Sequence, residues 1–181
     1  EEDVHYIDGI MVAGDSWMMS NDLYNSLPGA PDFIMDEQWY EDRFDVEPSV
    51  YKYMRQQRDG PFWDRASAKN KYHLIKVPGY HIGGWYDGYR NSLPRMIENV
   101  SAPVKAMIGP WDHDYPHDAA LKPQVEWRHE AVRWFDQFLK QKNTGILDEP
   151  KFAIYMRDYH EPDDSIEYIP GYWRWEDEWP P

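Results

Sequence analysis

The chain has 181 residues, of which 41% are hydrophobic and 17% aromatic, so it holds enough apolar material for the core of one domain. Its formal net charge of -14 argues against nucleic acid and an anionic membrane surface as partners, because both are bound through basic patches. There is no cysteine, which excludes disulfides, thiolate nucleophiles and cysteine zinc sites, and no run approaches the ~18 apolar residues of a membrane span.

Residues 1–70 combine loop chemistry with short helical patterns and carry no strand signal. The segment 36–44 has an aromatic helical face, and Pro48 suits the first turn of a second helix that ends at Gly60. A further short helical turn is predicted at 62–67. This part of the chain has the character of an insertion over a sheet.

The stretch 77–117 predicts a strand, a helix and a second strand. Two short apolar runs, 80–88 and 104–113, each lead into a Gly, a Trp and then an acidic or imidazole side chain. The segment 91–99 between them has apolar residues at helical intervals. A right-handed crossover of this kind places both strands parallel in one sheet of an α/β fold. Ligands bind at the carboxyl ends of such strands.

The rest of the chain predicts one long helix and one strand. Residues 124–142 carry an apolar stripe at helical spacing, and the helix is predicted to end at the sequence Asn-Thr-Gly that closes with Gly145. Residues 151–156 alternate like a strand. Residues 162–181 are polar and rich in Pro and Trp, and we interpret them as a loop or the lead-in to another domain.

Two side chains that follow the carboxyl ends of the predicted strands are the candidate catalytic residues. Asp87 follows the first strand and His113 follows the second, the chain order in which these residues occur in the Ser-His-Asp triad of α/β-hydrolases. In a triad the carboxylate orients the imidazole, and the imidazole accepts the serine proton. Trp85 and Trp111, two residues before each of them, are candidates to line the substrate pocket.

Two other interpretations of the second loop remain open at this point. His113 and His117 are four residues apart and flanked by acidic residues, a spacing that could hold a metal ion on a helix. Pro116 indicates a loop there instead. The simplest alternative is a solvated acidic loop whose histidine stacks on an aromatic ring.

The motifs GGWYDGYRNSLPRM (83–96) and GPWDHDYPH (109–117) resemble the second half of the catalytic domain of the CocE/NonD hydrolases, the S15 X-Pro dipeptidyl-peptidase and cocaine-esterase family. In that family an Asp in G-W-x-D-G and a His in G-P-W-x-H complete the triad, which implies catalytic roles for Asp87 and His113. The resemblance implies a partial α/β-hydrolase fold: a helical cap segment at 1–70, the second half of the core at 71–145, and an exit strand and linker at 146–181 toward a further domain.

The family's nucleophile lies in a G-x-S-x-x-G elbow upstream of the cap, and this chain departs from that pattern. None of its serines sits in a G-x-S-x-G turn; Ser16 comes nearest, but Met18 replaces the second glycine of that turn. We therefore expect a fragment that lacks its nucleophile, is inactive alone, and forms homo-oligomers or associates with the missing portion of its protein.

The resemblance implies a serine hydrolase that cleaves an ester or an amide, including an X-Pro dipeptidyl bond, by acyl transfer. It implies a small-molecule ester, amide or peptide as substrate, and no cofactor or metal. The alternative function is a non-catalytic remnant or isolated domain that acts as a binding module. Localisation stays open.

Overall fold

The computed structural model describes residues 6–7, 10–11, 34–44, 51, 54–56, 58–64, 67–69 and 71–180. The chain divides into two compact units, Glu1–Lys69 and Asn70–Pro181. Ser16, the serine that comes nearest to the elbow pattern without matching it, lies outside the described residues.

The first unit contains short elements. Strands β1 (Tyr6–Ile7) and β2 (Ile10–Met11) pair antiparallel, so the expectation that residues 1–70 contain no strand is wrong. Helix α2 (Glu37–Phe44) confirms the predicted helix and begins where the Asp36 carboxylate accepts the Trp39 amide hydrogen. Helix α4 (Pro61–Asp64) is a single turn that buries Trp63.

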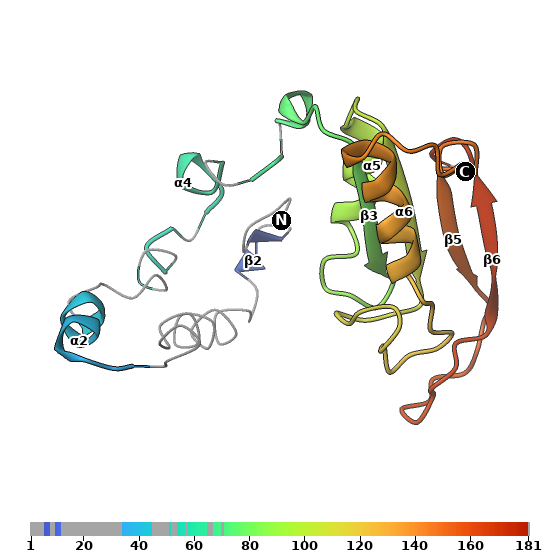
Figure 1. Ribbon diagram of the computed structural model, residues 1–181. Helices are drawn as coiled ribbons and strands as arrows, with labels where there is room; N and C mark the ends of the chain where they lie inside the picture. Colours follow the sequence, from blue (N-terminus) through green and yellow to red (C-terminus); the bar gives the residue numbers. More distant parts are fainter. Residues whose placement is uncertain are drawn as a thin grey trace. The chain divides into compact units, whose positions relative to one another are not determined.

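The second unit is built on one sheet of four strands in the order β3-β4-β5-β6 (Figure 1). Its strands are β3 (Gly79–Gly84), β4 (Val104–Gly109), β5 (Phe152–Arg157) and β6 (Gly171–Glu176). The first three strands are parallel, and β6 is antiparallel to β5. The 3-10 helix η1 (Tyr72–Leu74) precedes β3. This arrangement confirms the α/β class and the parallel pair predicted for 77–117.

Helix α5 (Ser92–Asn99) crosses from β3 to β4 and covers one face of the sheet. Its Leu93 and Ile97 pack with buried residues of β4 and β5, among them Ile108 and Ile154. Apolar residues three and four apart put these side chains on one helical face, as the sequence predicted.

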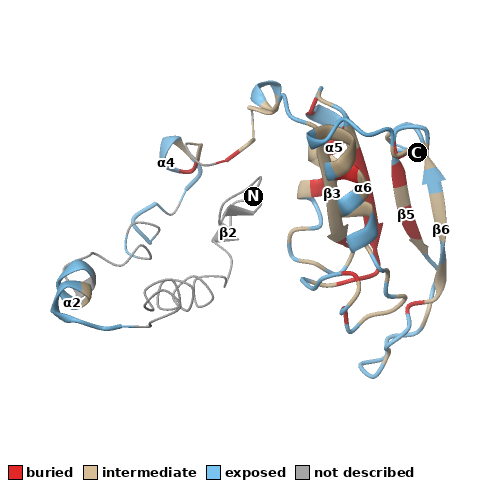
Figure 2. Ribbon diagram, viewed as in Figure 1, coloured by how far each residue is buried: buried red, intermediate tan, exposed pale blue. Residues whose placement is uncertain are grey.

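The opposite face carries a second cluster around Met107, Trp111 and Ala119. Helix α6 (Arg128–Leu139) reaches this side of β3, where the rings of Trp134 and Tyr80 are 5.6 Å apart. Because alternate residues of β4 face opposite sides of the sheet, this one strand contributes side chains to both clusters. Figure 2 shows that the buried residues of this unit concentrate on its strands.

Two boundaries differ from the sequence-based expectation. Helix α6 begins at Arg128, not 124, because the preceding residues bond to a loop: the Val125 amide donates to the Pro116 carbonyl at 2.8 Å. The segment expected to be a loop at 162–181 contains β6, whose first residue Gly171 has a φ of 156°. A Cβ at Gly171 would lie 2.1 Å from the Met156 carbonyl oxygen. The first residue of β6 therefore has to be glycine, because it approaches the main chain of β5 too closely for a side chain.

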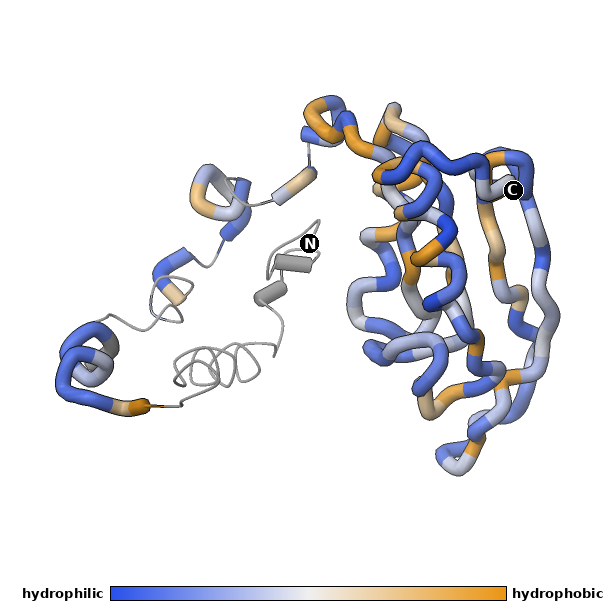
Figure 3. Tube along the Cα trace, in the orientation of Figure 1, coloured by the Kyte–Doolittle hydropathy of each residue, from blue (hydrophilic) through white to orange (hydrophobic). Residues whose placement is uncertain are grey.

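Helix α6 also presents apolar residues to the outside. Val132, Phe135 and Leu139 are exposed and recur at intervals of three and four, which places them on one face. Figure 3 shows the hydrophobic segments within this helix.

Within the described part of the chain, no helix combines the length and the apolar character needed to cross a bilayer.

Candidate active site

The site lies where two neighbouring parallel strands end. Gly84 of β3 pairs with Gly109 of β4, and both are the last residues of their strands. Asp87 follows three residues after the first and His113 four residues after the second. Since parallel strands share a carboxyl edge, the two side chains are delivered to the same place.

Asp87 and His113 form a hydrogen-bonded pair. The Nδ1 atom of His113 and the Oδ2 atom of Asp87 are 3.0 Å apart, which is an ordinary hydrogen-bonding distance. The other carboxylate oxygen accepts the Tyr89 amide hydrogen at 2.8 Å. An ionised carboxylate can only accept, so Nδ1 is the protonated nitrogen and Nε2 is left as the basic one.

The two partners differ in exposure. The Asp87 side chain is 14% exposed, and the His113 side chain is 64% exposed. Within the described part of the chain, Nε2 of His113 makes no hydrogen bond. The acid is thus fixed in its loop, while the basic nitrogen is free to meet another group.

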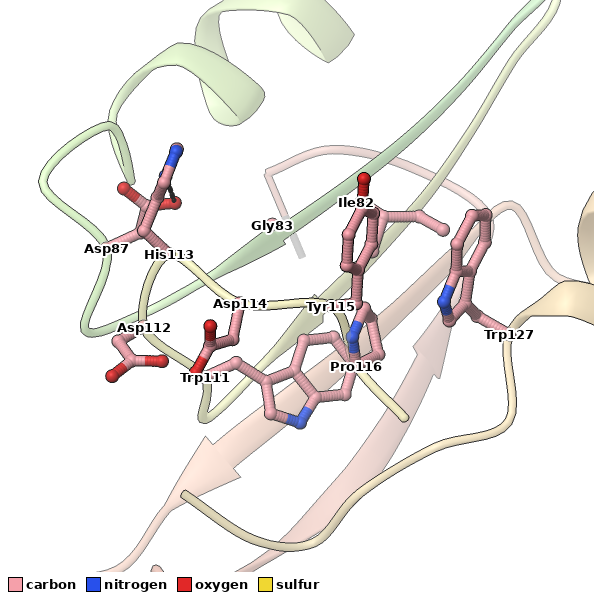
Figure 4. A pocket seen from close by; sticks show the side chains of 10 residues that line it. All are labelled: Ile82, Gly83, Asp87, Trp111, Asp112, His113, Asp114, Tyr115, Pro116 and Trp127. Atoms are coloured by element: carbon pink, nitrogen blue, oxygen red, sulfur yellow. Dashed lines mark hydrogen bonds and ion pairs between the residues drawn. The ribbon is translucent and has the colours of Figure 1, made fainter. Parts of the chain in front are cut away.

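A pocket of about 500 Å³ opens beside this pair (Figure 4). It is lined by Ile82, Gly83, Asp87, Trp111, Asp112, His113, Asp114, Tyr115, Pro116 and Trp127. The walls are mainly aromatic and aliphatic, with acidic groups on the side of the pair. No serine is among the described residues that line it.

One wall of the pocket was not anticipated from the sequence. The Trp127 indole N–H donates to Nδ1 of His117 at 3.0 Å, and the Tyr115 and Trp127 rings are nearly parallel with centroids 6.0 Å apart. His117 therefore uses Nδ1 as an acceptor and carries its proton on Nε2. The signal that could have indicated this wall is the break at Pro123, before the helix, after which Trp127 returns to the loop that follows β4.

The metal interpretation of this loop finds no supporting cluster. Among the described residues, no group of three or more His, Asp and Glu side chains is placed to hold a metal ion. The Nδ1 atoms of His113 and His117 face Asp87 and Trp127 instead.

Asp112 stands apart among the acidic residues. Burial, followed by the neighbouring charge of Asp114, raises the pKa of the Asp112 carboxyl above its usual range, and Asp87 adds to the effect. Its Oδ1 atom is buried and, in the described part of the chain, has no hydrogen-bond partner. The pocket therefore keeps a proton on this carboxyl to a higher pH than on an ordinary aspartate.

The two candidate tryptophans lie in different places. Trp111 borders the pocket, but it is only 1% exposed and its indole N–H donates to the Pro123 carbonyl at 2.9 Å. Trp85 is not among the lining residues, and its indole donates to the Tyr155 carbonyl at 2.8 Å. The structure thus brings together Asp87, His113 and Trp111, and places Trp85 against β5.

Comparison with known proteins agrees with the motifs and the sheet. The X-Pro dipeptidyl-peptidase family (S15 family) matches residues 5–115, a range that contains both Asp87 and His113. A search of curated proteins finds no match.

Crystal structures of a CocE/NonD family hydrolase from Staphylococcus aureus share the fold. One matches at a TM-score of 0.62 with 15% identity over 98% of this chain, and a second at 0.62 with 14% identity over 99%. In both cases the match covers 28% of the other chain, so this chain spans under a third of the structures it resembles. With the family matched over more than half of its length, the chain belongs to the X-Pro dipeptidyl-peptidase S15 family.

Proposed function

We propose that Asp87 and His113 are the acid and the base of a Ser-His-Asp triad, in a hydrolase that cleaves esters or amides by acyl transfer. The observation that carries this proposal is the half-satisfied imidazole: Nδ1 is held by Asp87 at 3.0 Å, while Nε2 is free beside a pocket of about 500 Å³.

The chemistry follows from the tautomer. With its proton on Nδ1, His113 accepts the serine proton at Nε2 as the hydroxyl oxygen attacks the carbonyl carbon. The same nitrogen then donates that proton to the leaving alcohol or amine. The Asp87 carboxylate keeps the ring oriented and stabilises the imidazolium that exists between these transfers.

The nucleophile is the part of the triad that these residues do not provide. No serine lies in a G-x-S-x-G turn, and no serine is among the described residues of the pocket. We propose that a serine outside the 181 residues completes the site, and that the isolated chain is inactive. The family supports a substrate with an X-Pro dipeptidyl bond, or a related small ester or amide.

The exposed face of α6 supports an association. Val132, Phe135 and Leu139 form an apolar stripe of the kind that is covered in assembled proteins. We propose that the part of the protein that supplies the serine, or a second copy of the chain, covers it. Sedimentation of the isolated chain distinguishes a monomer from a self-associating species.

The test uses the product of the whole gene. It is assayed with chromogenic esters and with X-Pro anilides, then labelled with a serine-reactive phosphonate that is located by mass spectrometry. We expect phosphonate-sensitive turnover, a labelled serine outside the 181 residues, and loss of turnover in His113→Ala.

A label on Ser16 or any other serine of this chain would contradict the placement of the nucleophile. The absence of both turnover and label would favour the alternative, a binding module whose aromatic pocket holds a small molecule without cleaving it. In that case the pocket is tested by binding of the same esters, with Trp127→Ala as the variant that should lose it.

A further inference from the structure

Each member of the Asp87–His113 pair follows two residues after a tryptophan that is tied to a distant part of the chain. The indole of Trp85 donates to the Tyr155 carbonyl of β5 at 2.8 Å. The indole of Trp111 donates to the Pro123 carbonyl at 2.9 Å. Both loops are therefore fastened by a side-chain N–H, a short distance along the chain from the group that would do the chemistry.

The same loops are also bonded to each other through their main chains. The Trp85 amide donates to the Gly109 carbonyl, and the Tyr86 amide to the Trp111 carbonyl, both at 2.9 Å. These bonds continue the pairing of β3 and β4 beyond the ends of the strands. They set the distance between the residues that precede Asp87 and His113.

Two glycines make this approach sterically feasible. A Cβ at Gly84 would lie 2.0 Å from the Trp111 carbonyl oxygen, and a Cβ at Gly109 would lie 2.5 Å from the Trp111 ring. Neither distance is tolerable for a carbon atom, so each motif needs its Gly beside its Trp. We call these four residues the clamp. Gly84 and Gly109 leave the space that Trp111 occupies, and Trp85 and Trp111 hold their loops through the hydrogen bonds of their indoles.

From this arrangement we infer that Trp85 and Trp111 are positioning residues that hold Asp87 and His113 in register, and that neither is a substrate contact. This inference rests on the proposed function, since it assigns the pair a geometry to keep. Trp111 has almost no surface left for a ligand, and Trp85 does not border the pocket. A shift of about 1 Å in a reacting group can cost about a hundredfold in rate, so even slack loops would be visible in turnover.

The test removes each indole N–H and keeps most of the ring. Trp85→Phe and Trp111→Phe are compared with Trp173→Phe in the product of the whole gene. Trp173 is a matched control because its ring packs between Trp111 and Tyr155, at centroid distances of 6.0 and 5.3 Å, while its indole has no hydrogen bond within the described residues.

We expect kcat to fall about tenfold in the first two variants with KM within about twofold, and the control to keep both values. In the 181-residue chain itself, the 15N chemical shift of His113 Nδ1 reports the bond to Asp87 without any need for activity. It should move in the two variants and stay in the control.

If a Phe variant does not fold, the Trp is replaced by 3-benzothienyl-alanine, which exchanges only the N–H for sulfur. A raised KM with unchanged kcat would show a substrate contact and overturn the inference, as would an unmoved Nδ1 shift in both variants or an equal effect of the control. A moved Nδ1 shift in a gene product without turnover would leave the positioning intact and reject the hydrolase.

Discussion

The two ends of strand β4 each carry a hydrogen-bonded pair of ionisable side chains, and the two pairs are built in opposite ways. At the amino end the Lys105 side chain, 9% exposed, donates to Glu149 at 3.0 Å and to the Ile146 carbonyl at 3.3 Å. Glu149 is also bonded by Arg133. At the carboxyl end, Asp87 is the secured partner and His113 is mostly exposed.

The difference lies in the groups that each pair leaves unused. At the amino end Lys105, Glu149 and Arg133 are bonded to one another or to main-chain carbonyls. At the carboxyl end, Nε2 of His113 is unoccupied within the described residues and faces a pocket. An unused basic nitrogen on a secured ring is the arrangement that general base catalysis requires.

The largest expected effect comes from removing the base. His113→Ala in the gene product should lower kcat/KM by on the order of 10⁴- to 10⁶-fold, because the serine then loses its proton acceptor. Turnover of a chromogenic ester checks this, and the thermal unfolding midpoint should stay near that of the parent since the side chain is exposed. A loss under tenfold would contradict the role of His113.

A smaller loss is expected from the acid. Asp87→Asn keeps the shape but favours the wrong tautomer of His113, and should lower kcat about 10³- to 10⁴-fold. The His113 ring nitrogens should exchange their 15N signatures in the same variant. An unchanged tautomer with reduced turnover would show that Asp87 acts in another way.

Next in size is a main-chain clash under the site. Gly84→Ala forces a Cβ to within 2.0 Å of a backbone oxygen and should reduce the free energy of unfolding by about 3 kcal/mol. Gly88→Ala is the control: nothing lies within 4 Å of its Cβ, and its effect should stay within about 0.5 kcal/mol. Urea unfolding measures both, and equal effects would disprove the clamp.

The smallest effect concerns the amino end of β4. The bond from Arg133, and then that from Lys105, lowers the pKa of the Glu149 carboxyl below its ordinary value of 4.5. A lowered folded-state pKa adds stability above the ordinary value, and that stability is lost as the pH falls through the folded one. Glu149→Gln should therefore cost about 1 kcal/mol at pH 7 and progressively less below about pH 4.5.

Urea unfolding at a series of pH values checks this, with Glu167→Gln as a control at an exposed ion pair with Lys122, where a smaller cost is expected. Activity should be unchanged in both variants. A loss of turnover in Glu149→Gln would show that the two ends of the strand are coupled.

The sequence was sufficient for the parts of the molecule that local pattern determines. The β3-α5-β4 unit follows from apolar runs bounded by glycine and from helical spacing between them. The approach of Asp87 to His113 follows from that topology, because residues after neighbouring parallel strands meet at one edge. Their catalytic role stays a prediction.

Long-range packing accounts for what the sequence did not indicate. Strand β6 lies in a polar, proline-rich segment, and only its pairing with β5 makes it a strand. Trp127 reaches the pocket because the segment before α6 bonds back to Pro116, which no helical periodicity reveals. The indole of Trp85 bonds to a carbonyl 70 residues away, a contact that its proximity to Asp87 in the sequence does not reveal.

That separation along the chain has a consequence for how the site assembles. Asp87 and His113 are 26 residues apart, and Trp85 and Tyr155 are 70 apart. Closing the longer loop costs about 1 kcal/mol more chain entropy, because the cost grows with the logarithm of loop length. Short-range contacts also form faster in folding. Asp87 and His113 thus come together within one contiguous stretch at a lower entropic cost. The hydrogen bond from Trp85 to Tyr155 forms only when β5, much later in the chain, joins the sheet.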